Sequence, residues 1–259
     1  MTHKEQFLKQ CMVLDTETTS NDYKVAEIIE SGFVTRSKDT WTVFQELHAP
    51  TNGTIPAKIQ SICYITNDMV KGKPPFVNSN QVFQNVVNQF KSGYLIAHNH
   101  FYDMRVLESH GVDTREFNWI CTWRMAKKIF GDAVGIEETN LPYLRFALEL
   151  DVPIDMYCHR AGNDAFITAK LLEVMIDYME MTGLIDKDLP YGPQVHEFAN
   201  SAIIYKTMPF GKHRGQLMTT VPMSYWKWAM DNTHWFDESA DNFDPDLMAS
   251  INMAISESH

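Results

Sequence analysis

An acidic residue on the apolar face of a predicted helix is the feature that most constrains how this chain can fold. Five hydrophobic residues at helical spacing follow Asp164: Ile167, Leu171, Val174, Met175 and Tyr178. Asp164 lies on the same stripe one turn earlier, so its carboxylate points into the protein rather than into water. Because an unpaired buried carboxylate is costly, we expect a metal ion or a strong hydrogen-bond donor beside it.

A short apolar run near the N-terminus, Cys11 to Leu14, leads directly into two more carboxylates. The run is typical of a buried strand. Asp15 and Glu17 follow it two positions apart, and in an extended strand such side chains leave the same face. The two carboxylates can therefore share one metal site. For this pattern alone, a strand that ends in a polar turn is the alternative interpretation.

Two further polar residues complete the set. Asp103 begins a predicted helix after the strand candidate at 94–97, and an aspartate in that place, taken alone, is interpreted as a helix cap. His159 precedes Asp164 by five residues, in the loop expected to enter the long helix, where an imidazole can reach solvent. A single histidine with a single aspartate is usually structural. Because they occur together in one chain, we do not interpret the three patterns as three unrelated sets of purely structural residues.

Four carboxylates and one base are the groups that two-metal phosphodiester hydrolysis requires. A phosphodiester is an anion with a poor leaving group, so its hydrolysis needs hard divalent cations that supply a hydroxide and stabilise the departing 3′ oxygen. Mg²⁺ takes oxygen ligands and keeps some of its water, so a few carboxylates can hold it. The patterns together therefore indicate a metal-dependent nuclease.

The three segments resemble the Exo I, II and III motifs of the DEDDh 3′-to-5′ exonucleases, the superfamily of polymerase proofreading subunits, oligoribonuclease and ribonuclease T. They read VLDTETTS, AHNHFYDMRVL and CHRAGNDAFITAKLL. The third matches the H-x-A-x-x-D-A form at His159, Ala161, Asp164 and Ala165. Cys63 and Tyr64 replace a customary His and Gly, and Tyr102 replaces a customary Phe. None of these departures removes a catalytic group.

The resemblance implies a role for each group. Asp15 bridges two Mg²⁺ ions, for which Mn²⁺ can substitute, while Glu17 and Asp164 complete the first metal site. Asp103 holds the second ion, largely through water. His159 takes the proton of the metal-bound water, which attacks the terminal phosphorus and releases a 5′-mononucleotide. The family also suggests a sugar and base pocket, for which we expect these substrate-binding residues: Thr18, His98, Asn99 and Tyr102.

The C-terminal part is similar to the tail module of exodeoxyribonuclease X-like enzymes, through MPFGKHRGQ and SYWKWAMDN. Two glycines bracket Lys212, His213 and Arg214, which lets backbone and side chains approach a phosphate closely. We expect Lys212 and Arg214 to bind substrate, with a hairpin turn of incidental charge as the alternative. The aromatic residues that follow either stack on bases or form the core of the small module: Tyr225, Trp226 and Trp228.

Charge is unevenly distributed along the chain. The net charge of −11 should slow encounters with a polyanion. Residues 206–230 nevertheless contain four Lys or Arg residues and no Asp or Glu, giving +4, whereas 231–259 contain seven acids and no Lys or Arg, giving −7. A local basic strip is therefore available for nucleic acid.

The order of predicted elements favours an α/β class. Strand-like stretches at 11–15, 25–35 and 41–48 suggest an antiparallel meander, and helices alternate with strands after it. We expect a ribonuclease H-like three-layer fold with a mixed sheet, plus a small C-terminal module. The corresponding boundaries are an exonuclease domain at 1–182, a connector with a short helix near 194–205 at 183–205, and the module at 206–259.

Other features narrow the setting. The chain has no apolar run near the length of a membrane span, and its four cysteines form no C-x-x-C, so neither a zinc site nor a disulfide framework is indicated. We expect a cytoplasmic protein with reduced thiols and no membrane partner. The expected substrate is DNA with a free 3′ end, single-stranded or frayed duplex.

Three functions are weighed. The first is a DNA 3′-to-5′ exonuclease of repair or nucleotide recycling, and the second is an exoribonuclease on the same scaffold. These two functions differ only in contacts to the ribose 2′-OH, and no motif in the sequence identifies residues that make such contacts. The third is a non-catalytic nucleic-acid or partner-binding protein, against which the presence of all five groups argues.

Overall fold

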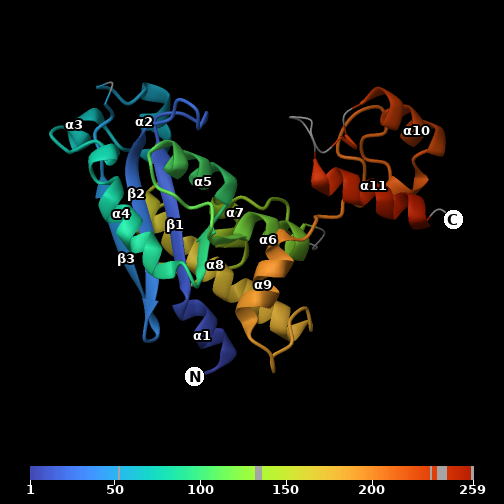
Figure 1. Cartoon of the computed structure of the whole chain (residues 1–259), viewed down its shortest axis with the longest axis horizontal. Helices are drawn as coiled ribbons and strands as arrows, with labels where there is room; N and C mark the ends of the chain where they lie inside the picture. The colour runs from blue at the N-terminus through green and yellow to red at the C-terminus, as the bar shows by residue number, and fades with distance from the viewer. Residues whose placement is uncertain (52, 132–135, 234, 238–243, 258–259) are drawn as a thin grey trace. The chain divides into compact units, whose positions relative to one another are not determined.

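The computed structural model describes residues 1–51, 53–131, 136–233, 235–237 and 244–257. The chain forms two compact units, Met1–Asn200 and Ser201–His259 (Figure 1). The division falls inside the expected 183–205 connector. The short helix predicted near 194–205 is observed at Tyr191–Asn200 as α9, and it belongs to the first unit.

The first unit is built on a mixed sheet of five strands. They are β1 (Cys11–Thr18), β2 (Ile28–Ser37), β3 (Thr40–Leu47), β4 (Tyr94–Ala97) and β5 (Asn118–Cys121). The strand order is β3-β2-β1-β4-β5. β1, β2 and β3 pair antiparallel, whereas β4 pairs parallel with both β1 and β5. The predicted antiparallel meander and the mixed sheet are therefore confirmed.

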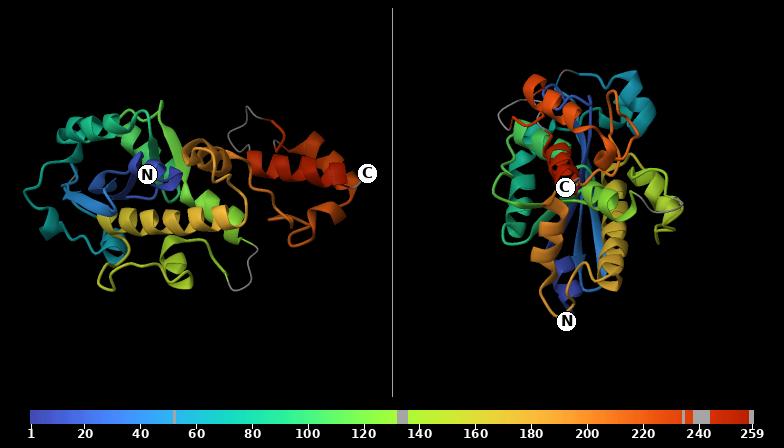
Figure 2. Two further views of the ribbon diagram at one scale, coloured as in Figure 1. Left: turned by 90° about the horizontal axis from the view of Figure 1, so that it is seen from below. Right: turned by 90° about the vertical axis from the view of Figure 1, so that its right-hand side faces the viewer.

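Helices cover both faces of this sheet, as Figure 2 shows for the long α8 on one side and α4 on the other. The first face packs on helices that share one core: α1 (His3–Lys9), α6 (Thr122–Phe130), α7 (Leu141–Ala147), α8 (Ala161–Met181) and α9. The second face packs mainly on α4 (Asn80–Val87) and α5 (His100–Ser109). Short helices lie between β3 and β4: α2 (Ala57–Cys63), α3 (Asn67–Val70), η1 (Phe76–Asn78) and η2 (Asn88–Phe90).

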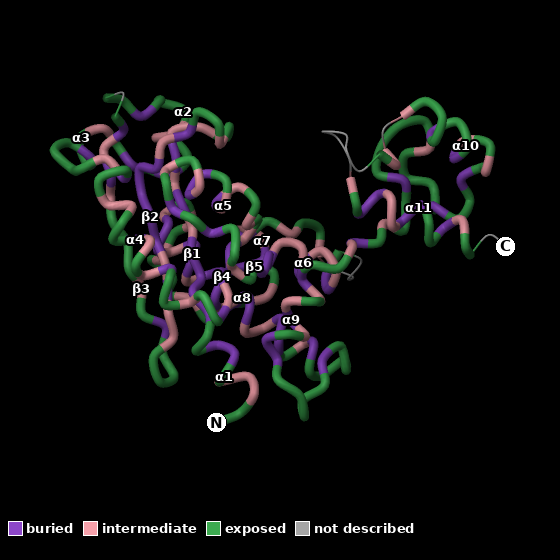
Figure 3. Tube along the Cα trace, in the orientation of Figure 1, coloured by how far each residue is buried: buried purple, intermediate pink, exposed green. Residues whose placement is uncertain are grey.

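Alternation along β1 divides its side chains between the two cores. Cys11 and Val13 belong to the core on the α8 side, and Met12 and Leu14 to the core on the α5 side. All four are at most 1% exposed, and β1 is buried along most of its length in Figure 3. This period of two is what a strand between two helical layers requires, and it fixes the direction of the polar residues that follow.

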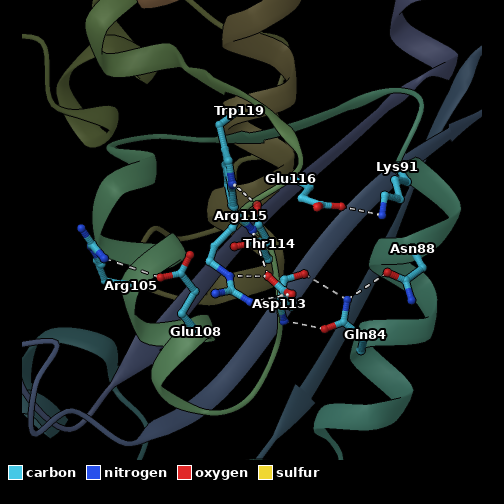
Figure 4. A network of polar contacts seen from close by, with 10 residues as sticks. All are labelled: Gln84, Asn88, Lys91, Arg105, Glu108, Asp113, Thr114, Arg115, Glu116 and Trp119. Carbon is cyan, nitrogen blue, oxygen red and sulfur yellow. Dashed lines mark hydrogen bonds and ion pairs between the residues drawn. The ribbon is translucent and has the colours of Figure 1, made fainter.

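A surface network holds the loop that returns from α5 to β5 (Figure 4). Arg115 donates from Nε and Nη2 to the two carboxylate oxygens of Asp113, each at 2.9 Å. Gln84 of α4 donates to the carbonyl of Asp113, and Trp119 Nε1 donates to the carbonyl of Thr114. These bonds tie the loop to α4 and to β5, which helps to fix the end of α5.

The second unit has its own hydrophobic core. Its elements are η3 (Met218–Thr220), α10 (Met223–Asn232) and α11 (Pro245–Glu257). Trp226, Leu247 and Ile251 pack together and are at most 2% exposed. Asp246 of α11 accepts a hydrogen bond from the backbone N–H of Ile203 at 2.9 Å, which joins the start of the unit to its last helix. Among the described helices of either unit, none is long and apolar enough to cross a membrane.

Candidate active site

The polar end of β1 directs two carboxylates toward α8. Asp15 and Glu17 continue the series of Cys11 and Val13, so they leave the face of the sheet that α8 covers. Both side chains are half-buried. Thr16 points to the opposite face, toward α5. The observed strand therefore places Asp15 and Glu17 on one face, as expected from their spacing.

The start of α8 brings His159 and Asp164 to the same place. One carboxylate oxygen of Glu17, one of Asp164 and one ring nitrogen of His159 all lie within 4.8 Å of one another. Asp164 is only 8% exposed, and its Oδ2 accepts a hydrogen bond from the backbone N–H of His159 at 2.9 Å. His159 itself is exposed and has a left-handed backbone with φ of 65°, a conformation that costs a non-glycine residue free energy.

Asp103 reaches the site from α5. It is 3% exposed, and its Oδ1 accepts a hydrogen bond from the hydroxyl of Thr16 at 2.8 Å. Thr16 stands between Asp15 and Glu17, so this bond ties the first turn of α5 to the polar end of β1. The capping interpretation of Asp103 is wrong, because Asn99 occupies the N-cap position of α5.

Negative charges accumulate in this site at an electrostatic cost. Burial first, and then the charges of Asp103 and Asp164, raise the pKa of Asp15 well above its usual value. Burial, followed by the charge of Asp164, raises the pKa of Glu17 to about 8. Burial also raises the pKa of Asp103 to about 7 and that of Asp164 to about 7, against the opposing effect of their hydrogen bonds. Four carboxylates are thus held where their charged forms need compensation.

The donor set fits a divalent cation. Asp164 Oδ1 is buried and has no hydrogen-bond partner among the described residues. A bound metal ion would supply the partner that this buried oxygen lacks. Carboxylate oxygens are the ligands that Mg²⁺ prefers, and a cation would relieve the mutual repulsion of the four acids. Asp15, Glu17, Asp103 and Asp164 could hold such ions.

The metal-free protein should lose stability as the pH rises. Folding raises the pKa values of these acids above the value of about 4 that they have in an unfolded chain, so the native state binds more protons than the unfolded state. Stability is therefore highest below pH about 4 with respect to these groups, and it is lost as the pH rises to about 8. Thermal unfolding in EDTA across this range measures the effect.

Addition of Mg²⁺ provides the control for that prediction. It should raise the unfolding temperature strongly at pH 8 and little at pH 5, because protonated carboxylates bind the ion poorly. A stability profile that stays flat from pH 4 to pH 8 in EDTA would show that the carboxylates do not repel one another in the native state.

Glu30 is a neighbour of the site that the sequence analysis missed. It is the cross-strand partner of Glu17 on β2 and is fully buried. Its carboxylate accepts hydrogen bonds from the guanidinium of Arg160, the shortest at 2.6 Å, and from the backbone N–H of Ala161 at 2.8 Å. Glu30 thereby anchors the first residues of α8. The sequence contains one signal for this role: Glu30 directly follows the apolar Ile28 and Ile29 inside the predicted strand at 25–35.

Replacement of Glu30 should destabilise the protein. Glu30→Ala leaves the half-buried guanidinium of Arg160 and a backbone N–H without their acceptor, so we expect a loss of roughly 3 kcal/mol in the free energy of unfolding. The matched control is the exposed ion pair of Lys91 and Glu116 (Figure 4), whose Nζ and Oε2 atoms are 2.9 Å apart. Glu116→Ala should shift the denaturation midpoint far less. Equal shifts in urea titrations would contradict the anchoring role of Glu30.

A glycine on β2 allows α8 to approach the sheet. A Cβ added at Gly32 would lie 2.2 Å from the backbone nitrogen of Gly162 in α8. No side chain can be accommodated at that distance, so the backbones of β2 and α8 are in direct contact here. This contact sets how far Asp164 stands from the carboxylates of β1.

The expected substrate-binding residues fall into separate groups. Thr18 and Tyr102 meet at the end of β1, where their hydroxyl oxygens are 2.5 Å apart. His98 uses one ring nitrogen with the hydroxyl of Thr122 and the other with the carbonyl of Thr139, and burial lowers its pKa to about 4. Asn99 is exposed, with φ of 71°. Lys212 and Arg214 are exposed in the second unit. Their contacts with substrate stay predictions.

Family models match both parts of the chain. A model described as an exonuclease matches residues 12–172, which contain all five candidate catalytic groups. A second model, provisionally described as a quorum-sensing-regulated virulence factor, matches residues 199–238.

Known proteins with similar sequences or structures include several nucleases. Exodeoxyribonuclease 10 of Escherichia coli strain K12 is 28% identical over 202 residues, which cover 76% of this chain and 78% of the relative. The DNA polymerase III subunit epsilon of Treponema pallidum is 30% identical over 167 residues, which cover 62% of this chain and 74% of the relative. A structure of Exonuclease X in complex with 5′ overhanging duplex DNA has a TM-score of 0.53 and 25% identity over 73% of this chain and 99% of that one.

Proposed function

Because this chain belongs to the exonuclease family whose model matches residues 12–172, the DEDDh 3′-to-5′ exonucleases, we propose that it removes 5′-mononucleotides from the 3′ end of DNA with the help of Mg²⁺. We favour DNA over RNA for two reasons. The name of the similar Exodeoxyribonuclease 10 states an activity on DNA, and the similar Exonuclease X structure is a complex with duplex DNA. The ribonuclease H-like α/β fold agrees with this family.

One observation carries the proposal. Three elements far apart in the sequence, β1, α5 and α8, bring Asp15, Glu17, Asp103 and Asp164 together, and the pKa values of all four carboxylates are raised. A non-catalytic protein gains nothing from this arrangement, because the mutual repulsion only destabilises it. His159 is placed beside two of these acids and is open to solvent.

Each group of residues has a separate role in the proposed hydrolysis. The four carboxylates would hold divalent ions, which would supply activation of the attacking water and stabilisation of the departing 3′ oxygen. His159 accepts the proton of the attacking water from its place beside Glu17 and Asp164. The backbone bond from His159 to Asp164 keeps the base in position. Thr18 and Tyr102 are proposed to contact the terminal nucleotide.

A cleavage assay with matched oligonucleotides tests the function. Purified protein with Mg²⁺ should release the label of 3′-labelled DNA as a mononucleotide at once, while 5′-labelled DNA shortens stepwise. EDTA should stop both reactions, and Mg²⁺ or Mn²⁺ should restore them. Internal fragments, or products only from the 5′ end, would overturn the proposal. RNA of the same sequence is the second substrate, and faster cleavage of RNA would show that the enzyme is an exoribonuclease.

A further inference from the structure

The second unit contains an open pocket that the chemistry of the candidate active site does not use. Its volume is about 660 Å³. The residues that carry the following argument come from the turn at 211–213, from α10 and from the segment after α10: Gly211, Lys212, His213, Tyr225, Trp228 and Trp235. Aromatic rings and a lysine therefore meet around one cavity.

The phase of α10 directs Trp226 into the core of the unit and Trp228 to the pocket. Trp226 is 2% exposed and packs in the core of the unit, whereas Trp228 is 49% exposed. Tyr225 and Trp228 are three positions apart, so they share one face of the helix. Their rings are stacked, with centroids 5.4 Å apart and planes inclined by 28°. Tyr225 also packs against the core, whereas Trp228 does not belong to it, so Trp228 is the aromatic residue that the pocket presents without serving the core.

The turn before α10 places cationic groups at the edge of this surface. The backbone N–H of Met208 donates to the carbonyl of Gln216, and that of Gly215 donates to Met208, which closes the turn. Gly211 has φ of 74°, and a Cβ there would lie 3.2 Å from the hydroxyl of Tyr225. The ring of His213 packs edge-on against Tyr225, with centroids 4.5 Å apart. Lys212 is held beside the aromatic rings by this turn.

The positive charges of this region are available to a ligand. Lys212, Arg214 and Lys227 are exposed and form no ion pair within the part of the chain that the structure describes. The sequence from 206 to 230 contains no acidic residue. A ligand that combines a flat apolar face with a negative charge matches such a surface.

We propose that this pocket binds an unpaired nucleotide of a single-stranded nucleic acid, with its base stacked on Trp228 and its phosphate beside Lys212. Aromatic faces accept any base, because every base has a π-face, and lysine attracts the backbone without selecting a sequence. The proposal rests on the proposed function, since a 3′-to-5′ exonuclease gains from holding the strand that it degrades. It assigns to the second unit a substrate contact independent of the chemistry.

Binding by the full chain, without turnover, tests the pocket. The Asp15→Asn variant in EDTA is titrated against a fluorescent single-stranded DNA of about 15 nucleotides, and anisotropy gives the affinity. Trp228→Ala should weaken binding about tenfold, as expected for the loss of one stacked base. Trp228→Phe should retain most of the affinity. Lys212→Ala should reduce the slope of log affinity against log salt by roughly one.

Phe44→Ala is the matched control, because Phe44 is an aromatic residue of similar exposure, 47%, in the first unit. It should leave the affinity unchanged. If circular dichroism shows that Trp228→Ala does not fold, Trp228→Leu replaces it, since leucine keeps an apolar side chain but has no stacking face. Wild-type affinity in the folded Ala or Leu variant, or no binding of DNA by the full chain, overturns the proposal. Equal weakening with RNA supports stacking on the base.

A separate measurement distinguishes failure of the pocket from failure of the proposed function. Hydrolysis of the p-nitrophenyl ester of thymidine 5′-monophosphate needs only the first unit, so Trp228→Ala in the active background should keep its rate. Normal hydrolysis with unchanged DNA affinity would overturn the pocket alone. Binding that depends on Trp228, in a wild-type protein that hydrolyses nothing, would overturn the exonuclease and leave the pocket.

Discussion

Replacement of Asp15 by asparagine should lower the rate of 3′-end hydrolysis by more than about 1,000-fold, because loss of a group that only orients a metal ligand already costs 10 to 100-fold. Asp15 lies on β1, and after burial the largest causes that raise its pKa are the charges of Asp103 on α5 and Asp164 on α8. Initial rates on 3′-labelled DNA at saturating Mg²⁺ measure the effect.

The same variant should fold normally. Asparagine has the shape of aspartate and removes one of the charges that repel one another, so the metal-free variant should unfold at a higher temperature than the wild type at pH 8. Asp39→Asn is the matched control, because Asp39 is exposed in the turn between β2 and β3. If Asp15→Asn retained near-normal turnover, the two-metal assignment would be wrong.

Replacement of His159 by alanine should lower the rate by a factor of about 100 to 10,000, the usual contribution of a positioned general base. His159 is exposed in the loop before α8, so the loss of its ring should leave the fold unchanged. Added imidazole should restore part of the activity, because the vacated space adjoins Glu17 and Asp164.

Metal affinity separates the two roles that the position of His159 allows. A proton acceptor can be removed without weakening the metal site, whereas a ligand cannot. Calorimetric titration of His159→Ala with Mn²⁺ should therefore give the wild-type affinity. Weakened Mn²⁺ binding without rescue by imidazole would make His159 a metal ligand and remove it as the base.

Local periodicity made the main parts of the site predictable. The apolar run before Asp15 and the stripe that contains Asp164 each determine the direction of a carboxylate through a repeat of two or 3.6 residues. Asp103 was harder to interpret, because an acid near the start of a helix commonly caps it. Its true contact, the hydroxyl of Thr16, lies 87 residues away in the chain, and no local pattern encodes such a distance.

Contacts that depend on register could not be predicted in the same way. Glu30 stands opposite Glu17 only because β1 and β2 pair with one particular alignment, and the Arg160 that it binds arrives from 130 residues further on. The aromatic residues of α10 posed a different problem. Tyr225, Trp226 and Trp228 are equally suited to a core or to a ligand surface, and only the orientation of the helix in the folded unit shows which of them is buried.

The contact between Gly32 and Gly162 bears on how mutational scans of this protein should be interpreted. A methyl group at Gly32 would collide with the backbone of α8, so α8 would have to shift and carry Asp164 and His159 away from Asp15. A scan that measures only activity would then give Gly32 a loss as large as that of the four carboxylates of the site, although Gly32 has no side chain that could touch a substrate. Scoring abundance and activity in parallel separates residues that perform chemistry from residues whose smallness keeps the chemical groups within reach of one another.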